Sequence, residues 1–294
     1  MTTVAVALAA ARAKLPASEA RLLLGHLLDR SAAWLIVHDD QVVEENELLA
    51  FASLVARRAG GEPVAYLVGQ REFFGREFAV LSAVLIPRPE TELLVEIALA
   101  KVGAGSTASS APRVLDLGTG SGCIAVTLAL EIPQTQVTAL DASAAALKIA
   151  RKNAERLGAQ LRILQSDWFA ALAGERFDLI VANPPYIAAA DPHLAVADLR
   201  HEPVAALVSG ADGLDAIRQI IAAAPEHLMP GGQLWLEHGY DQAAAVRDLL
   251  ATAGLAEIEQ HRDLAGIVRV SGGRLGAAST ALPDTCLVER KKAG

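Results

Sequence analysis

Cysteine and long apolar runs are scarce in this chain of 294 residues. Its two cysteines, Cys123 and Cys286, are too few for a disulfide framework and lack the spacing of metal ligands. The apolar stretches end well before the roughly 20 residues that a membrane-spanning helix needs. The Ala-rich start includes Arg12 and Lys14 and lacks the apolar block and cleavage site of a signal peptide. Together these absences predict a cytoplasmic protein that does not bind a membrane.

Basic charge is also sparse. The chain has 26 Lys and Arg against 34 Asp and Glu, a formal net charge of −8. Residues 1–75 carry seven Lys or Arg and nine Asp or Glu, without a basic stripe. Because neutralisation of phosphate supplies most of the affinity for nucleic acid, we expect no direct nucleic-acid binding. Apolar side chains, at 52%, suffice for one large domain or a large and a small one.

Residues 1–72 have the pattern of a small helical bundle. Apolar residues recur at helical spacing around Leu24 and again around Phe51. Ser31 precedes a short apolar run that fits a further helix, and basic residues, two glycines and a proline in 57–63 predict a helix end. Residues 73–90 are a predicted linker, with alternating residues at 73–86 and Gly75 as the turn of a β-hairpin.

Residues 91–275 alternate short apolar strands with amphipathic helices. Strands are predicted at 114–117, 137–140, 161–164, 179–181 and 234–236, and two more near 256–262 and 266–270 close the edge of the sheet. A flexible linker is predicted at 102–112, and residues 276–294 are a tail without a clear period. The fold class is therefore α/β, with a Rossmann-like parallel sheet covered on both faces by helices.

A glycine-rich segment, Asp116-Leu117-Gly118-Thr119-Gly120-Ser121-Gly122, follows the first of these strands. Glycine lets the backbone turn tightly and approach a ligand closely, although such a loop is also compatible with a simple turn. Ligands in doubly wound sheets bind at the carboxyl ends of the strands. This placement makes the loop the first candidate for a cofactor site.

Two further strand ends carry candidate cofactor contacts. Asp141 ends the second strand, where its carboxylate can accept both hydroxyls of a ribose; the alternative is a helix-start residue ahead of Ser143. Asp167 follows the third strand and can accept the amino group of adenine, and Trp168 can cover the ring or belong to the core.

The spacing of the glycines separates two classes of cofactor. Dinucleotide sites use G-x-G-x-x-G at a helix N-terminus, whereas this loop reads G-x-G-x-G after Asp116. A carboxylate repels phosphate but suits a sulfonium or ammonium group. The loop therefore favours S-adenosyl-L-methionine.

The sequence Asn183-Pro184-Pro185-Tyr186 follows the fourth strand and suits the methylation of an amide nitrogen. That nitrogen is a poor nucleophile and must be held in line with the methyl group while its two hydrogens find acceptors. The Asn183 carboxamide oxygen can accept one hydrogen and the Pro184 carbonyl the other, and Tyr186 offers a flat face to the planar amide. The alternative is a proline-rich turn that ends a strand.

In these motifs the chain resembles the HemK-type protein-glutamine methyltransferases, which modify peptide chain release factors. The resemblance runs from about residue 22 to 274. Beyond the Asn-Pro-Pro-Tyr tetrapeptide it rests on Glu62-Pro63, Tyr66, Gly69, Glu72-Phe73 and Gly75; Ile86-Pro87-Arg88-Pro89-Glu90-Thr91-Glu92; Glu202-Pro203, Ala206-Leu207 and Asp212-Gly213-Leu214; Leu236-Glu237-His238-Gly239 with Gln242; and Asp263-Leu264 with Arg269-Val270. His201 departs from the aromatic residue common there, and the tail runs beyond the usual end.

The resemblance implies a seven-stranded class I methyltransferase domain preceded by a helical bundle and a hairpin. Residues 118–122, Asp141, Trp168 and Asn183 would bind S-adenosylmethionine. Residues 183–186 would hold the glutamine of a Gly-Gly-Gln tripeptide in a release factor, as part of translation termination. The bundle would help to dock this protein substrate, and a monomer is the expected state.

Three other functions remain as alternatives. Relatives with the same tetrapeptide methylate glutamine in a ribosomal protein, and others methylate the amino group of a nucleic-acid base. The third alternative is a nicotinamide-dependent oxidoreductase or a nucleotide-binding module without catalysis. Glu237 and His238 end a strand near the site, and Cys123 is interpreted as a packed residue and not as a nucleophile.

Overall fold

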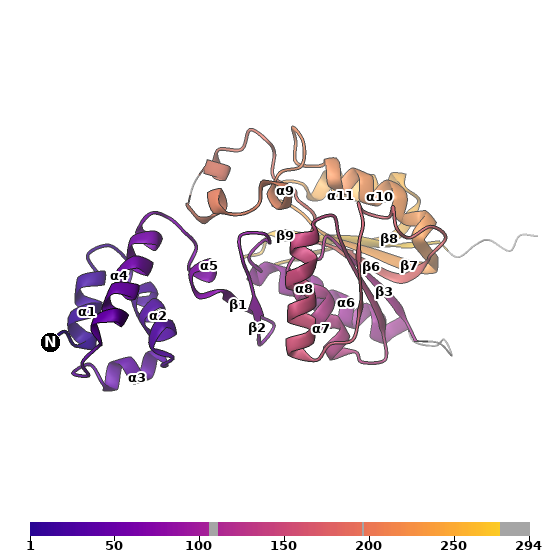
Figure 1. Ribbon diagram of the computed structural model, residues 1–294. Coiled ribbons are helices and arrows are strands. Elements are labelled where there is room, and N and C mark those ends of the chain that lie inside the picture. Colours follow the sequence, from indigo (N-terminus) through magenta and orange to yellow (C-terminus); the bar gives the residue numbers. More distant parts are fainter. Residues whose placement is uncertain (106–110, 196, 277–294) are drawn as a thin grey trace, which may run out of the picture.

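The computed structural model describes residues 1–105, 111–195 and 197–276. A bundle of helices lies to one side of a larger α/β part, and a two-stranded hairpin lies between them (Figure 1). The helices are α1 (Val4–Ala11), α2 (Ala17–Leu28), α3 (Ala32–Val37), α4 (Glu45–Ala59), α5 (Val64–Val68), α6 (Glu92–Gly105), α7 (Cys123–Glu131), α8 (Ala144–Leu157), α9 (Val204–Leu207), α10 (Asp215–His227) and α11 (Ala243–Thr252), with 3₁₀ turns η1 (Pro89–Thr91), η2 (Pro192–Ala195) and η3 (Ala197–His201). No helix in the described residues is long and apolar enough to cross a membrane.

The strands form two sheets. They are β1 (Gln70–Phe73), β2 (Arg76–Ala79), β3 (Arg113–Leu117), β4 (Gln136–Asp141), β5 (Arg162–Gln165), β6 (Phe177–Ala182), β7 (Leu228–Glu237), β8 (Leu255–Arg262) and β9 (Val268–Leu275). Strands β1 and β2 form the hairpin, and the other seven form one sheet in the order β5-β4-β3-β6-β7-β9-β8. The predicted seven-stranded α/β fold is confirmed.

One strand departs from the predicted parallel sheet. Strands β3 to β7 pair in parallel, but β9 is antiparallel to both β7 and β8. The connection between β8 and β9 is too short for a crossover, so the second strand must run in the opposite direction. Strand β9 inserts beside β7 and leaves β8 at the edge.

The order of the strands decides where a ligand can bind. The chain starts in the middle of the sheet at β3, runs outward through β4 and β5, and then returns to the other side of β3 as β6. The connections on either side of β3 therefore leave opposite faces, and a crevice opens at its carboxyl end. Figure 1 shows α6, α7 and α8 on one side of the strands and α10 and α11 on the other.

The bundle has its own apolar core. Leu24 and Phe51, on which the predicted helical spacing centres, are buried in it, and so are Leu23 and Leu35. The Ser31 side chain accepts a hydrogen bond from the Trp34 backbone at the start of α3, which explains why the short apolar run is helical.

The hairpin is displaced from its predicted place. It begins at Gln70 and ends at Ala79, with Phe74 and Gly75 both at positive φ in the turn. The alternating residues at 80–86 continue as a loop and not as a strand, with Val80 and Val84 buried against α8 and Leu81 exposed.

Two limits of the sequence prediction lie near the ends of elements. Helix α6 continues to Gly105, so the predicted linker at 102–112 begins later, and residues 106–110 of it lie outside the described residues. The predicted tail after Gly276 also lies outside them. The domain boundaries at 72, 90 and 275 stay predictions.

The side chain of Asn153 in α8 joins the hairpin to the glycine loop. Its oxygen accepts from the backbone of Ala79 at 2.8 Å, and its amide nitrogen donates to the carbonyls of Ala79 at 3.0 Å and Ser121 at 2.8 Å. Asn153 is fully buried, and these contacts satisfy its acceptor and both of its donor hydrogens. One residue of the sheet domain thus positions both segments.

Candidate active site

The glycine loop connects β3 to α7 and turns sharply. Gly118, Gly120 and Gly122 have φ of 73°, 56° and 83°, a region that residues with a Cβ rarely adopt. A Cβ on Gly122 would lie 3.2 Å from Ala150 of α8, so this glycine also permits close packing of two helices. The loop is held to β4 by a 2.8 Å hydrogen bond from the Thr119 backbone to the Leu140 carbonyl.

Asp116 lies underneath this loop and not on its open face. The side chain is fully buried, and its Oδ2 accepts a 2.6 Å hydrogen bond from the Thr119 hydroxyl. Its Oδ1 has no hydrogen-bond partner among the described residues. Burial raises the pKa of Asp116 to about 7, an effect that the Thr119 hydrogen bond opposes. The carboxyl group that was expected to carry a negative charge beside a cationic ligand is therefore only partly ionised near neutral pH, and its charge depends on pH.

Asp141 and Trp168 flank the loop. The Asp141 carboxylate accepts backbone hydrogen bonds from Gly120 at 2.9 Å and Ser143 at 2.8 Å. Each oxygen keeps a second lone pair for a ribose hydroxyl. Burial raises the pKa of Asp141, and those two backbone hydrogen bonds oppose the effect. Asp141 thus serves the loop and the helix start as well as the cavity.

The turn after β5 places an aromatic ring against the glycine loop. Trp168 has a φ of 43°, and a Cβ on Gly118 would lie 3.7 Å from its ring. The Ser166 hydroxyl stabilises this turn by donating to the Trp168 carbonyl at 2.7 Å. Asp167 is exposed at the cavity rim. The ring of Trp168 is half-buried, so it packs on the core and also forms part of the cavity.

These segments enclose a cavity of about 270 Å³. Its wall joins the candidate cofactor residues to the segment after β6 and to the loop before α6. The lining residues that matter below are Val84, Thr91, Gly118, Thr119, Gly120, Ser121, Asp141, Asp167, Trp168, Asn183, Pro185 and Pro203. Asp116, Gly122, Pro184 and Tyr186 adjoin these residues in sequence but do not themselves line the cavity. The structure therefore brings the predicted loop, strand ends and tetrapeptide to one cavity.

Two oxygens of the tetrapeptide are available as acceptors. The Asn183 amide nitrogen donates to the Thr91 hydroxyl at 3.0 Å, while the Asn183 Oδ1 is buried without a partner among the described residues. No donor in the described part of the chain reaches the Pro184 carbonyl oxygen. A buried acceptor without a partner is costly, so such an atom points to a ligand that supplies a donor.

Tyr186 is held from behind the cavity. Its hydroxyl donates to Glu237 Oε1 at 3.2 Å, and its carbonyl accepts from the Gln242 side chain at 2.9 Å. Burial, followed by the charge of Glu237, raises the pKa of Tyr186, so the phenol stays protonated at neutral pH. A protonated phenol cannot act as a base, and the two hydrogen bonds fix the position of the ring.

Sequence reasoning did not assign Thr91 to the site. Its hydroxyl donates to Glu237 Oε2 at 2.7 Å and accepts from Asn183. The sequence does point to both residues, because Thr91 and Glu237 belong to the motifs that carry the resemblance. What the sequence lacks is the hydrogen bond between them, which joins residues 146 positions apart.

Glu202 is a second residue that the structure adds. It is buried, accepts a 3.0 Å hydrogen bond from the Ile86 backbone and pairs with Arg88. This contact fastens the loop before α6 to the segment after the tetrapeptide, on both sides of the cavity.

Two candidates stand apart from the chemistry. His238 is buried against Ser271 and the Gly239 carbonyl, away from the cavity, and burial lowers its pKa. Burial raises the pKa of the Cys123 thiol to about 12, which suits a packed residue and not a nucleophile.

Comparison with known structures agrees with the fold. A methyltransferase from Pyrococcus furiosus superimposes with a TM-score of 0.53 at 18% identity, over 76% of this chain and 99% of its own. The 16S rRNA N2 G1207 methyltransferase of T. thermophilus, solved with AdoMet and guanosine, gives 0.51 at 23% identity, over 70% of this chain and 49% of its own. The family model "Methyltransferase small domain" matches residues 91–211. The fold is that of a class I methyltransferase.

Closer relatives define the particular family. A second family model, "PrmC N-terminal domain", matches residues 2–69. The release factor glutamine methyltransferase of Bordetella pertussis is 57% identical over 262 residues, which cover 89% of this chain and 96% of the relative. That of Burkholderia pseudomallei is 55% identical over 268 residues, 89% of this chain and 93% of the relative. The chain belongs to the release factor glutamine methyltransferase family.

Proposed function

We propose that this protein methylates the side-chain amide nitrogen of the glutamine in the Gly-Gly-Gln motif of class 1 peptide chain release factors, with S-adenosyl-L-methionine as methyl donor. The observation that carries the proposal is the Asn183 oxygen, which is buried at the cavity without a partner among the described residues. The names of the relatives supply the substrate class.

The cavity residues fit the methyl donor. The glycine loop offers backbone close to a ligand, Asp141 keeps free lone pairs for a ribose, and Trp168 and Asp167 offer a flat face and an acceptor for adenine. The carboxyl group of Asp116 behind the loop favours a cation over a phosphate. S-adenosylmethionine supplies an electrophilic methyl group on a sulfonium.

The acceptor half of the cavity fits a primary amide. Two hydrogens on the glutamine nitrogen need two acceptors, and the Asn183 Oδ1 and the Pro184 carbonyl supply them. Positive charge grows on this nitrogen as the new bond forms, so both hydrogen bonds strengthen in the transition state. The amide then loses a proton readily, and no dedicated base is required of the chain.

The helical bundle supports a protein substrate. It joins the sheet domain on the side of the segment that follows the tetrapeptide (Figure 1), and residues 1–75 have no basic excess to attract nucleic acid. We therefore expect the bundle to dock the release factor while its Gly-Gly-Gln loop enters the cavity.

The test is methyl transfer to a purified release factor, followed by mass spectrometry of the tryptic peptides. The expected result is a single added methyl group on the glutamine of the tripeptide, absent when that glutamine is replaced by alanine. Label on ribosomal protein instead, or on nuclease-sensitive material, would contradict the proposal.

A further inference from the structure

Four side chains, two of which line the cavity, are connected by hydrogen bonds. Glu237, at the end of β7, is fully buried and accepts from the hydroxyls of Thr91 at 2.7 Å and Tyr186 at 3.2 Å. Thr91 is also buried and accepts from the Asn183 amide nitrogen at 3.0 Å. The acceptor oxygen of Asn183 is at the other end of that amide, facing no described donor.

The number of available protons decides which group donates in each of these hydrogen bonds. Burial raises the pKa of Glu237, and the hydrogen bonds from Thr91 and Tyr186, which favour the ionised form, oppose this rise. In that ionised form the carboxylate has no proton to donate, so each contact with Glu237 must be donated by its partner. The Thr91 hydroxyl has one proton, and it is committed to Glu237. Its oxygen can then only accept, and of the two ends of the Asn183 carboxamide only the NH₂ can donate to it. The opposite orientation would put two acceptors face to face.

We propose that Thr91 and Glu237 are positioning residues that orient the Asn183 carboxamide so that its oxygen, and not its NH₂, faces the substrate. This inference rests on the proposed function, because an oxygen is what the NH₂ of a glutamine side chain requires. An Asn183 carboxamide rotated by 180° would turn its own NH₂ toward the NH₂ of the substrate glutamine, and two donors cannot bond to each other. The chain of hydrogen bonds therefore selects an amide hydrogen donor as substrate.

The same carboxylate also fixes the second wall of the acceptor site. Tyr186 is tied to Glu237 through its hydroxyl and to Gln242 through its carbonyl. Glu237 thus holds both the acceptor oxygen, through Thr91, and the aromatic face, directly. Loss of Glu237 should cost more than loss of Thr91 alone.

The first experiment replaces the Thr91 hydroxyl by a methyl group of the same shape. Thr91→Val should lower kcat on release factor about tenfold, in line with the loss of one orienting hydrogen bond, and leave the affinity for S-adenosylhomocysteine unchanged. Thr91→Ser keeps the hydroxyl and should restore most of kcat. Thr127→Val is the matched control, because Thr127 is fully buried in α7 and its hydroxyl has no partner among the described residues.

A double-mutant cycle then asks whether Thr91 acts through Asn183. Thr91→Val should lower kcat in the parent protein but have little further effect in Asn183→Ala, because no carboxamide is left to orient. Equal losses in both backgrounds would overturn the proposal. So would a Thr91→Ser variant no more active than Thr91→Val when thermal unfolding shows both to be folded.

A binding measurement separates this inference from the proposed function. With S-adenosylhomocysteine present, a Gly-Gly-Gln peptide should bind the parent protein more tightly than Thr91→Val or Glu237→Gln. A peptide with glutamate in place of glutamine should lose this preference. If the parent protein methylates no release factor, the proposed function fails; if it does so and Thr91→Val matches it in kcat and peptide affinity, the positioning role alone fails.

Discussion

At the scale of single residues, the buried oxygen of Asn183 is the atom on which we expect catalysis to depend. Asn183→Ala removes the acceptor and should lower turnover by about 10²- to 10³-fold, as does the loss of one preorganised partner of a developing charge. The measurement is single-turnover methylation at saturating cofactor. Full activity in this variant would show that the amide nitrogen is held by other groups.

We expect Asp116 to make cofactor binding dependent on pH. Its pKa of about 7 means that near neutral pH the free protein is divided between the protonated and the ionised carboxyl. A cationic ligand favours the ionised form and so lowers this pKa. Binding should therefore release a proton, and affinity for S-adenosylmethionine should rise as pH increases from about 6 to 8. Calorimetry in two buffers of different ionisation enthalpy measures the released proton.

Two comparisons isolate this effect. Asp116→Asn cannot ionise and should show a flat pH dependence over the same range. S-adenosylhomocysteine lacks the sulfonium charge, so its binding to the parent protein should release a smaller fraction of a proton. An identical pH profile for the parent and Asp116→Asn would assign the dependence to another group.

The residue types at the site were largely predictable, but their contacts were not. The glycine loop, Asp141, Trp168 and Asn183 occur at strand ends, which the apolar pattern locates well. The depth of Asp116 below the loop depends on how the chain turns after β3. The bond between Thr91 and Glu237 depends on the sheet order, which brings two segments distant in sequence together. The roles of these residues in binding and catalysis stay predictions.

At the scale of elements, the turn before α10 is packed against the tetrapeptide. Gly213 has a φ of 79°, and a Cβ there would lie 2.3 Å from the Tyr186 carbonyl oxygen and 2.7 Å from the Gln242 amide. Gly213→Ala should therefore reduce the free energy of unfolding by about 2–4 kcal/mol, in the range of strained and overpacked positions. Chemical denaturation followed by circular dichroism measures this loss.

Gly254 provides the control for strain alone. Its φ is 83°, yet a Cβ would meet nothing within 4 Å. Gly254→Ala should cost about 1 kcal/mol, the penalty of the left-handed backbone without a collision. Equal losses in the two variants would mean that the turn yields freely and that Tyr186 is not held by it.

Elements were predictable where the apolar period is clear. The strands from β3 to β7 and helix α8 with its Ser143 cap follow from the pattern. The direction of β9 does not, because the residue pattern of a strand is compatible with both parallel and antiparallel pairing. The loop at 80–86 was mistaken for part of the hairpin, since its buried residues alternate as strand residues do although it pairs with no partner strand in the described chain.

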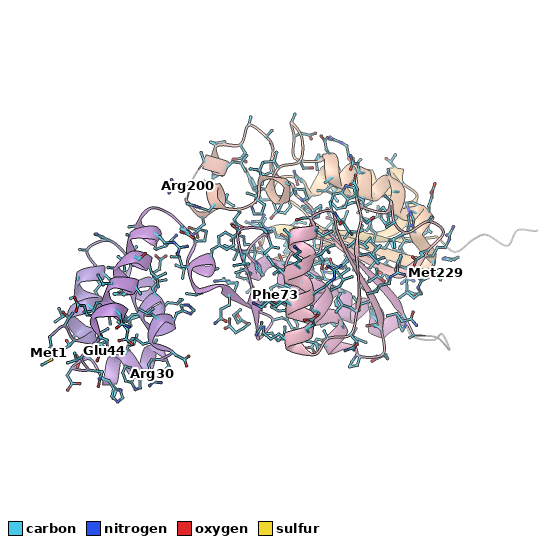
Figure 2. All side chains as sticks on the ribbon, in the orientation of Figure 1. Met1, Arg30, Glu44, Phe73, Arg200 and Met229 are labelled. Atoms are coloured by element: carbon cyan, nitrogen blue, oxygen red, sulfur yellow. The ribbon has the colours of Figure 1, made fainter. Side chains whose placement is uncertain are left out.

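At the scale of the whole molecule, Arg58 connects the bundle to the segment after the tetrapeptide. Its guanidinium pairs with Glu19 of α2 at 2.7 Å and with Asp198 of η3 at 2.7 Å. Arg200 of the same segment reaches back to the Gly60 carbonyl (Figure 2). The bundle and the segment beside the active site are thus joined directly.

Breaking this connection should affect large substrates alone. Arg58→Ala should raise KM for release factor about threefold to tenfold, since a partly buried charged hydrogen bond contributes roughly 1 kcal/mol. KM for a short Gly-Gly-Gln peptide should not change, because the peptide does not reach the bundle. Steady-state kinetics on both substrates measure the difference.

Arg57→Ala is the matched control, since Arg57 pairs with Glu62, at the end of the bundle itself. It should leave both values of KM unchanged. A parallel rise of KM for protein and peptide in Arg58→Ala would instead indicate that the cavity itself is distorted.

The hairpin has a practical consequence for dissecting the molecule. Phe73 and Phe78 are buried in the same core as Leu94 and Val95 of α6, and Asn153 makes two of its three hydrogen bonds with Ala79. A catalytic fragment that begins at residue 91 would lack the hairpin with Phe73 and Phe78, and would leave the Asn153 side chain without its partner Ala79. One begun at Gln70 would keep both rings and that amide in place. It would remove the bundle and α5, with the 2.6 Å hydrogen bond from the Tyr66 hydroxyl to the Val84 carbonyl, and should still fold and take up the methyl donor.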